Sequence, residues 1–179
     1  MTNKLSFSYG GLKSPSYSES ISALYIIFLG YKIKNPFYWM IFMINGLSAF
    51  LAHSPYIDNN YSKVRKLSSY IDAVSIYYPL ILYIFSINKF FSFFTLLLVD
   101  FIFNCKLYKF VLKYNFILIL PSIIKIISKG ALYKFPFIIL ITFLSKYMEE
   151  KYIIKSLGIK YHTIWHIFGT HMFKNILLM

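Results

Sequence analysis

The chain of 179 residues contains one cysteine, Cys105, which excludes an intrachain disulfide framework and a zinc ribbon built from cysteines. It contains seven glycines, and the adjacent pair Gly10 and Gly11 lies in a polar stretch without a strand–helix context, so no phosphate-binding loop is indicated. Charged residues make up only 14% of the chain, against about 25% in typical soluble domains. A soluble enzyme, a nucleotide-binding protein and a nucleic-acid binder are therefore disfavoured.

Hydrophobic residues are abundant instead, at 58% of the chain, and the mean hydropathy is +0.60. A water-soluble core of this size would not hide so many Phe, Ile, Leu and Tyr side chains, so the composition favours a lipid bilayer as the solvent. The net charge of +13 comes from Lys residues that lie between apolar runs and not along one face. Such a pattern is typical of membrane topology signals.

Breaks formed by Lys, Asn, Pro or charge clusters divide the chain into seven apolar segments, at 20–34, 37–53, 70–87, 90–105, 114–128, 131–147 and 161–178. We therefore predict an all-α integral membrane protein with a seven-transmembrane helix bundle over residues 20–179. Residues 1–19 are Ser-rich, have no signal-peptide core, and are predicted to form a flexible tail. The segment at 20–34 is the weakest candidate span, because its apolar core "ISALYIIFLGY" is followed by Lys32 and Lys34, and this leaves a six-span arrangement open.

With seven spans, more Lys and Arg residues share a side with the N-terminal tail than with the C-terminus. The positive-inside rule then predicts a multi-pass protein with a cytoplasmic N-terminus. The sequence does not distinguish the endoplasmic reticulum or Golgi from the plasma membrane.

Three of the four histidines lie in "YHTIWHIFGTH" at 161–171, at the start of the last apolar segment. His162 and His166 are four residues apart, so they differ by about 40° in direction around a helix. His53 ends the second segment. With seven spans, the end of the second segment and the start of the last one lie at the same membrane interface, so His53 is expected near His162 and His166. His171 is about 140° further round from His166 and is expected to face elsewhere.

Three histidines plus one water form the arrangement of a catalytic zinc ion, because the open position activates the water. Asp72 opens the third segment on the same side and is predicted to act as general base. Ser48, in the same segment as His53, is predicted to orient the water or a substrate carbonyl. The metal ligands are thus predicted as His53, His162 and His166, and the catalytic residues as Asp72 and Ser48.

Simpler interpretations remain open for each of these residues. The histidine pair could lie in an interface with water and headgroups, Asp72 could cap a helix, and Ser48 could serve helix packing beside Gly46. Asp100 is a further acid within an apolar segment, and the sequence assigns it no role.

The serine and histidine ending one segment, the aspartate opening the next and the final H-x-x-x-H together resemble the CREST superfamily. That group includes alkaline ceramidases, progestin and adiponectin receptors, haemolysin III relatives and Per-type proteins of GPI-anchor remodelling. "HTIWH" is most similar to the His-x-x-Trp-His of the ceramidase and Per-type branches. The sequence departs from the family where Ser is usually four residues before His, since that position is Ala49.

The resemblance implies a zinc-dependent membrane hydrolase of a lipid amide or ester, with the lipid substrate entering laterally from the membrane. Membrane lipids are the expected partners, Zn²⁺ the cofactor, and nucleic acid is not expected. Two alternatives stay open. One is a seven-helix receptor or lipid-binding protein in which zinc is structural, and the other is a small transporter or structural membrane protein without metal.

Overall fold

The computed structural model describes residues 15–57, 62–85, 89–102 and 151–177, and single positions at 110, 124, 127, 128, 130 and 136. Four helices come first: α1 (Tyr17–Tyr31), α2 (Pro36–His53), α3 (Ser62–Phe85) and α4 (Lys89–Ile102). The C-terminal part contains β1 (Tyr152–Ile154), η3 (Lys155–Leu157), β2 (Ile159–Lys160), α8 (Tyr161–Ile164), the π-helical segment η4 (Trp165–Gly169) and α9 (Thr170–Leu177).

Side-chain caps determine where the first two helices begin. The Oγ of Ser16 accepts a hydrogen bond from the backbone N–H of Glu19 at 3.5 Å. The side chain of Asn35 accepts from the N–H groups of Phe37 and Tyr38, and proline occupies the first helical position of α2. Asn and Ser are strong N-caps because they satisfy N–H groups that lack a partner within the helix.

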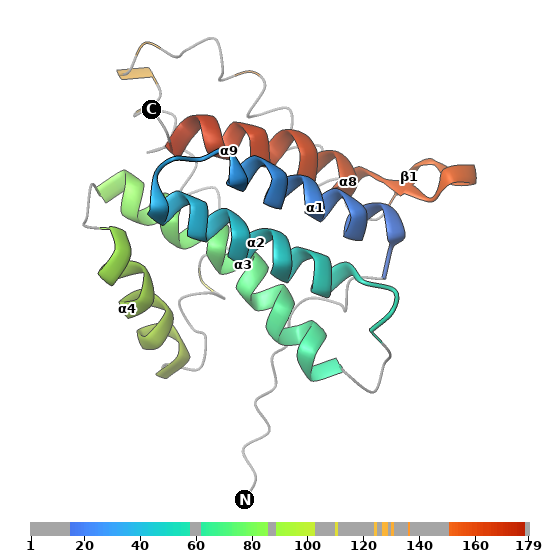
Figure 1. The fold of residues 1–179 in the computed structure, drawn as a ribbon, viewed down its shortest axis with the longest axis horizontal. Helices are drawn as coiled ribbons and strands as arrows, with labels where there is room; N and C mark the ends of the chain where they lie inside the picture. The colour runs from blue at the N-terminus through green and yellow to red at the C-terminus, as the bar shows by residue number, and fades with distance from the viewer. Residues whose placement is uncertain are drawn as a thin grey trace, which may run out of the picture.

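The helices pack in a sequence of neighbours, with α2 between α1 and α3, and with α1 between α2 and the C-terminal helix (Figure 1). The contact between α1 and α2 is close because a Cβ atom on Gly46 would lie 2.5 Å from Ile27 Cγ1 and 3.2 Å from the carbonyl oxygen of Ala23. Tyr78 and Phe42 are among the largest fully buried side chains in the core. The start of α1, the end of α2 and α8 lie on the same side of this row of helices (Figure 1).

The short hairpin of β1 and β2 precedes the C-terminal helix. The strands are antiparallel, with Tyr152 opposite Lys160 and Ile154 opposite Ile159. Gly158 has φ of 62° at the turn, a left-handed conformation that glycine adopts without steric cost. Because β2 runs directly into α8, the hairpin fixes where the helix with His162 begins.

Within residues 15–57, 62–85, 89–102 and 151–177, no helix has both the length and the apolar character needed to cross a bilayer. The prediction of a seven-transmembrane helix bundle is therefore wrong. Helices α1 and α4 have 15 and 14 residues, short of the roughly 20 that a span needs. α3 is longer, but it opens with the polar stretch "SKVRKLSS".

The same finding contradicts the prediction of a multi-pass integral membrane protein. The cytoplasmic N-terminus was inferred from the number of spans, so that inference has no support either. The predicted segments 114–128 and 131–147 lie almost wholly outside the described residues. α1 begins at Tyr17, ahead of the predicted domain boundary at residue 20, and residues 1–14 are outside the described part.

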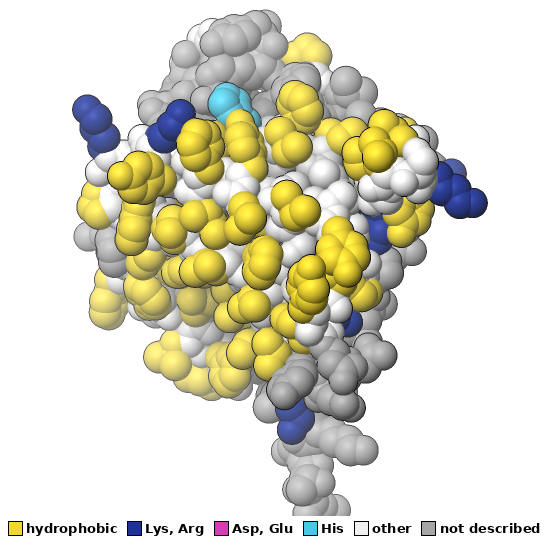
Figure 2. All heavy atoms as spheres, turned by 45° about the vertical axis from the view of Figure 1, so that its right-hand side comes forward, with side chains coloured by type: hydrophobic (Ala, Val, Ile, Leu, Met, Phe, Trp, Pro, Cys, Tyr) yellow, Lys and Arg dark blue, Asp and Glu magenta, His cyan; other side chains and the backbone are white. Residues whose placement is uncertain are grey.

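Many of the apolar side chains that suggested a bilayer are exposed on helix surfaces. Hydrophobic side chains cover a broad face of the molecule, and Lys and Arg lie toward its edges (Figure 2). On α1 the exposed residues recur at helical spacing, and on α4 they form a similar row. These are Ile21, Leu24, Phe28 and Tyr31 on α1, and Phe91, Phe94, Leu98 and Phe101 on α4.

Candidate metal centre

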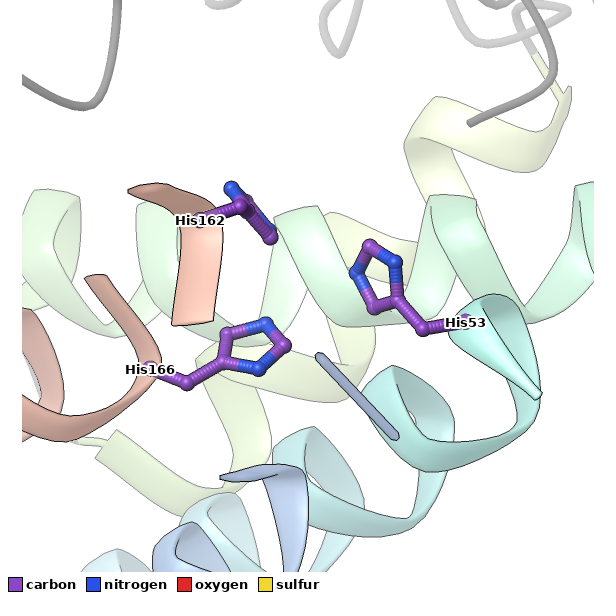
Figure 3. Close-up of side chains that lie close together, drawn as sticks. All are labelled: His53, His162 and His166. Carbon is purple, nitrogen blue, oxygen red and sulfur yellow. The ribbon is translucent and has the colours of Figure 1, made fainter. Parts of the chain in front are cut away.

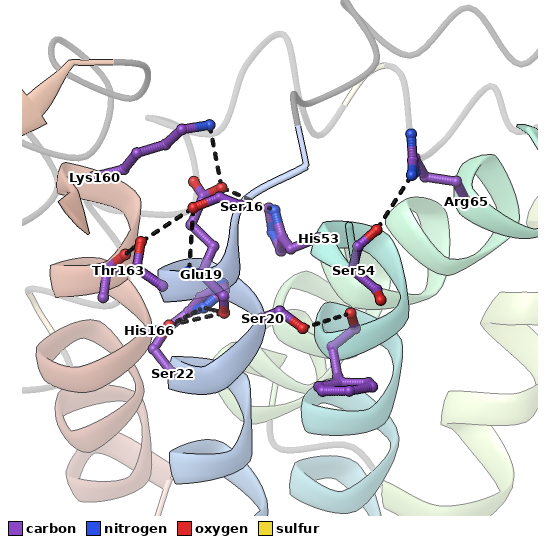
Figure 4. Close-up of polar contacts among 12 residues, drawn as sticks. Ser16, Glu19, Ser20, Ser22, His53, Ser54, Arg65, Lys160, Thr163 and His166 are labelled. Atoms are coloured by element: carbon purple, nitrogen blue, oxygen red, sulfur yellow. Dashed lines mark hydrogen bonds and ion pairs between the residues drawn. The ribbon is translucent and has the colours of Figure 1, made fainter. Parts of the chain in front are cut away.

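Three helix ends meet at one place in the fold: the N-terminus of α1, the C-terminus of α2 and the N-terminus of α8 (Figure 4). The backbone N–H of Ser16 donates to the carbonyl oxygen of His53 at 3.0 Å, which joins the start of α1 to the end of α2. Ser18 Oγ donates to the carbonyl oxygen of Gly158 at 2.9 Å, and Thr163 Oγ1 donates to Ser18 Oγ at 3.0 Å. These bonds hold the hairpin and α8 against α1.

The three histidines predicted as metal ligands lie together at this junction (Figure 3). The ring centroids are 4.9 Å apart for His53 and His162, 5.1 Å for His53 and His166, and 4.7 Å for His162 and His166. One nitrogen from each ring lies within 4.8 Å of the others, and all three side chains are buried. The group could hold a metal ion.

Hydrogen bonds determine which nitrogen of His166 carries the proton. Its Nδ1 lies 3.0 Å from the carbonyl oxygen of Glu19 and 2.8 Å from Ser22 Oγ, while the Ser22 hydroxyl donates to the same carbonyl at 2.9 Å. Since a carbonyl only accepts, Nδ1 is the protonated nitrogen and Nε2 holds the lone pair. This is the arrangement found in metal-binding histidines, whose second ring nitrogen is bound to a protein acceptor.

Glu19 places a carboxylate beside the histidines, and sequence reasoning missed it. Its Oε2 lies 3.5 Å from His53 Nδ1 and 3.4 Å from Lys160 Nζ, and all three side chains are buried. A carboxylate facing Nδ1 of a histidine directs the other nitrogen, Nε2, toward a metal. Lys160 supplies a positive charge that balances the buried carboxylate.

The signal for Glu19 was present in the sequence as "SYSE", the S-x-x-E pattern of a capping box. In that motif the glutamate side chain bonds to the N–H of the capping serine. Here the Ser16 N–H donates to His53, and the Glu19 carboxylate faces Lys160 and His53 instead. The pattern therefore predicts the helix start and gives no indication of the contact with the histidines.

The helix that carries His162 and His166 changes from α to π geometry at Trp165. A Cβ atom on Gly169 would lie 2.5 Å from Trp165 Cε3, so the indole covers the glycine closely. Such π-segments are uncommon and occur often at functional sites. The segment sets the direction of His166 relative to His162.

The donor set fits a borderline-soft divalent cation. Three imidazoles suit zinc, copper, iron or nickel, whereas magnesium and calcium prefer oxygen ligands. The site would offer three protein ligands and leave a further position for water, as in catalytic zinc sites.

Asp72 and Ser48 lie in a polar network between α2 and α3. Asn45 Nδ2 donates to Asp72 Oδ1 at 2.8 Å and to the Asp72 carbonyl oxygen at 2.9 Å, and Ser48 Oγ donates to the Asn45 carbonyl oxygen at 3.0 Å. Asn45 precedes His53 by eight residues, about 12 Å along the axis of α2. The catalytic roles assigned to Asp72 and Ser48 stay predictions.

Two further residues from the sequence are placed away from the histidine cluster. His171 is exposed on α9. Asp100 is fully buried, and its Oδ2 accepts hydrogen bonds from Tyr70 at 3.0 Å and from Tyr78 at 2.6 Å. Burial, then the bond to Asp100, raises the pKa of the Tyr78 hydroxyl. Asp100 thus joins α4 to α3.

Comparison of the chain with family models, with curated proteins and with solved structures gives no match.

Proposed function

We propose that this protein is a zinc-dependent hydrolase of an amide or ester bond in a lipid, with His53, His162 and His166 as the metal ligands. The observation that carries the proposal is the convergence of three buried imidazoles from separate helices, with His166 held by acceptors at Nδ1. The CREST-like order of Ser48, His53, Asp72 and H-x-x-x-H supports the same chemistry.

A zinc ion held by three histidines lowers the pKa of a bound water and polarises a carbonyl group. The residues of the chain have two tasks around it. Glu19 and Ser22 orient the imidazoles of His53 and His166 through their Nδ1 atoms, which leaves Nε2 of each ring to face the metal. Asp72 is proposed to accept the proton during hydrolysis.

A lipid substrate is supported by the apolar side chains exposed on the helices that form the site. Leu47 and Leu51 on α2, and Ile21 and Leu24 on α1, are between 40% and 64% exposed. An acyl chain lying along these helices would bury apolar area next to the cluster, which is favourable at about 25 cal/mol per Å².

The test is hydrolysis of a ceramide by zinc-loaded full-length protein, with release of the fatty acid followed by mass spectrometry. We expect Asp72→Asn to keep its zinc and to lose at least about 100-fold in kcat, since general-base catalysis contributes that much. His162→Ala should lose both zinc and activity. His171→Ala is the matched control, because His171 is exposed, and it should keep both.

Two results would contradict the proposal. Turnover that persists in His162→Ala would separate the activity from the cluster. Stoichiometric zinc with no hydrolysis of lipid amides or esters, together with a loss of stability in His162→Ala, would instead favour a structural zinc that joins α2 to α8.

A further inference from the structure

Arg65, in the first turn of α3, is a buried cation beside the site. The side chain is 5% exposed. Its Nη2 donates to the carbonyl oxygen of Ser54 at 3.2 Å and to the carbonyl oxygen of Ile57. Its Nε–H has no acceptor among the residues that the structure describes.

The acidic side chains of the described residues are engaged elsewhere. Glu19 contacts Lys160, Asp72 accepts from Asn45, and Asp100 accepts from two tyrosines. Within this part of the chain, Arg65 is thus held by neutral carbonyl groups alone. A buried guanidinium without a counter-charge is costly, and a cation in the first turn of a helix opposes the helix dipole. Both effects would be relieved by an anion bound at this position.

The position of Arg65 relates it to the histidine cluster. Ser54, whose carbonyl it binds, directly follows His53, and Figure 4 places Arg65 across the end of α2 from Glu19 and Lys160. Lys63, on the same turn of α3, is exposed and adds positive charge around the site. An anionic group bound at Arg65 would therefore lie at the same end of α2 as the histidine cluster.

We propose that Arg65 binds a phosphate or carboxylate group of the substrate, so that the substrate is an anionic lipid amide or ester. This inference rests on the proposed function and names its substrate class. The guanidinium suits the task because its planar donors match phosphate and carboxylate oxygens and it remains charged at every physiological pH. Arg65 acts as a specificity residue and takes no part in bond cleavage.

Binding is measured first, by calorimetry on zinc-loaded full-length protein, with decyl phosphate and inorganic phosphate as the two probes. We expect Arg65→Met to weaken decyl phosphate binding by at least about 10-fold, because it removes charge-assisted hydrogen bonds. Arg65→Lys keeps the charge without the planar donors and should give an intermediate loss. Lys63→Met is the exposed control and should stay within about twofold of wild type. Tighter binding of decyl phosphate than of inorganic phosphate would identify a lipid headgroup as the ligand, whereas equal binding would identify free phosphate.

Kinetics separate recognition from a structural role of Arg65. N-decanoylglycine and its neutral carboxamide differ only in the anionic group. Wild type should favour the anion in kcat/KM by about 10-fold or more, and Arg65→Met should lose this preference. If neither compound is cleaved but decyl phosphate binding still depends on Arg65, the proposed function fails and the anion site stands.

Three results would overturn the inference. Arg65→Met could bind decyl phosphate as wild type does, or it could slow both substrates equally. The third is a loss of stability in Asp58→Asn equal to that in Arg65→Met, because the acid next to Ile57 in sequence would then be the counter-charge. Zinc content and thermal unfolding of each variant show that the cluster is intact.

Discussion

Replacing Glu19 by Gln tests whether the carboxylate orients the metal ligands. Gln has nearly the same volume as Glu, so the packing of α1 is preserved while the charge is removed. The carboxylate lies 3.5 Å from His53 Nδ1, and loss of such an outer partner typically lowers metal affinity 10- to 100-fold. That range corresponds to about 1.4–2.7 kcal/mol of zinc binding energy.

The same substitution removes the partner of Lys160, which lies 3.4 Å from Glu19 with both side chains buried. Leaving one member of a buried ion pair without its counter-charge costs about 3–5 kcal/mol of folding stability. Glu19→Gln therefore carries two effects, and the second could be mistaken for the first. A second variant, Lys160→Met, separates them because it removes the cation and leaves the carboxylate facing His53.

The assay is a zinc titration against a competing chelator, with urea unfolding of each metal-free variant measured in parallel. The double variant Glu19→Gln/Lys160→Met should recover most of the stability lost in Glu19→Gln, since no unpaired charge remains buried. Its zinc affinity should stay 10- to 100-fold below that of wild type. Zinc affinity that recovers together with stability, or Glu19→Gln binding zinc within twofold of wild type, would refute an orienting role for Glu19.

Three further predictions concern single residues at the site and in the helix core. Gly169→Ala should lower zinc affinity by about 10-fold in the same titration. The new Cβ would displace the Trp165 indole, and with it the π-helical segment that contains His166. Unchanged zinc affinity would contradict this prediction. Gly46→Ala should reduce the free energy of unfolding in urea by about 1–3 kcal/mol, because its Cβ would meet the backbone of α1, and it should leave the zinc stoichiometry unchanged. A more stable variant would show that α1 and α2 separate easily. The raised pKa of Tyr78 means that the folded protein keeps a proton that the unfolded chain loses near pH 10, so the free energy of unfolding should fall above about pH 10, by up to about 1.4 kcal/mol per pH unit. Urea unfolding between pH 9 and 11 should show a smaller slope for Tyr78→Phe, and equal slopes would contradict the assignment.

The positions of the first helices were largely predictable from the sequence. The segments 20–34, 37–53 and 90–105 lie close to α1, α2 and α4, because Asn35 and Pro36 give a clear start and Lys32 and Lys34 interrupt the apolar pattern. Apolar content does not by itself indicate bilayer spans in this chain. Hydrophobicity averaged over the chain does not record how short each helix is, or that polar side chains such as Asn45 and Ser75 are buried in hydrogen-bonded networks.

The grouping of His53, His162 and His166 was predicted from a parity argument that depended on seven spans. In the structure the same residues lie together for another reason. The first turn of α1 contacts both the end of α2, which carries His53, and the C-terminal helix, which carries His166. The contact of Glu19 with His53 was not predictable, because it depends on how two helix ends meet in space. Sequence spacing gave the helical pair His162 and His166, and tertiary packing supplied the rest of the site.

Metal content of the purified full-length protein tests the central claim most directly, measured by mass spectrometry on wild type, His53→Ala, His162→Ala and the exposed control His171→Ala. We expect about one zinc per chain in wild type and in His171→Ala, and its loss in both cluster variants, since a three-histidine site does not survive removal of one ligand. Zinc-free wild type after reconstitution with excess zinc, or zinc retained in His53→Ala and His162→Ala, would contradict a metal centre at these histidines.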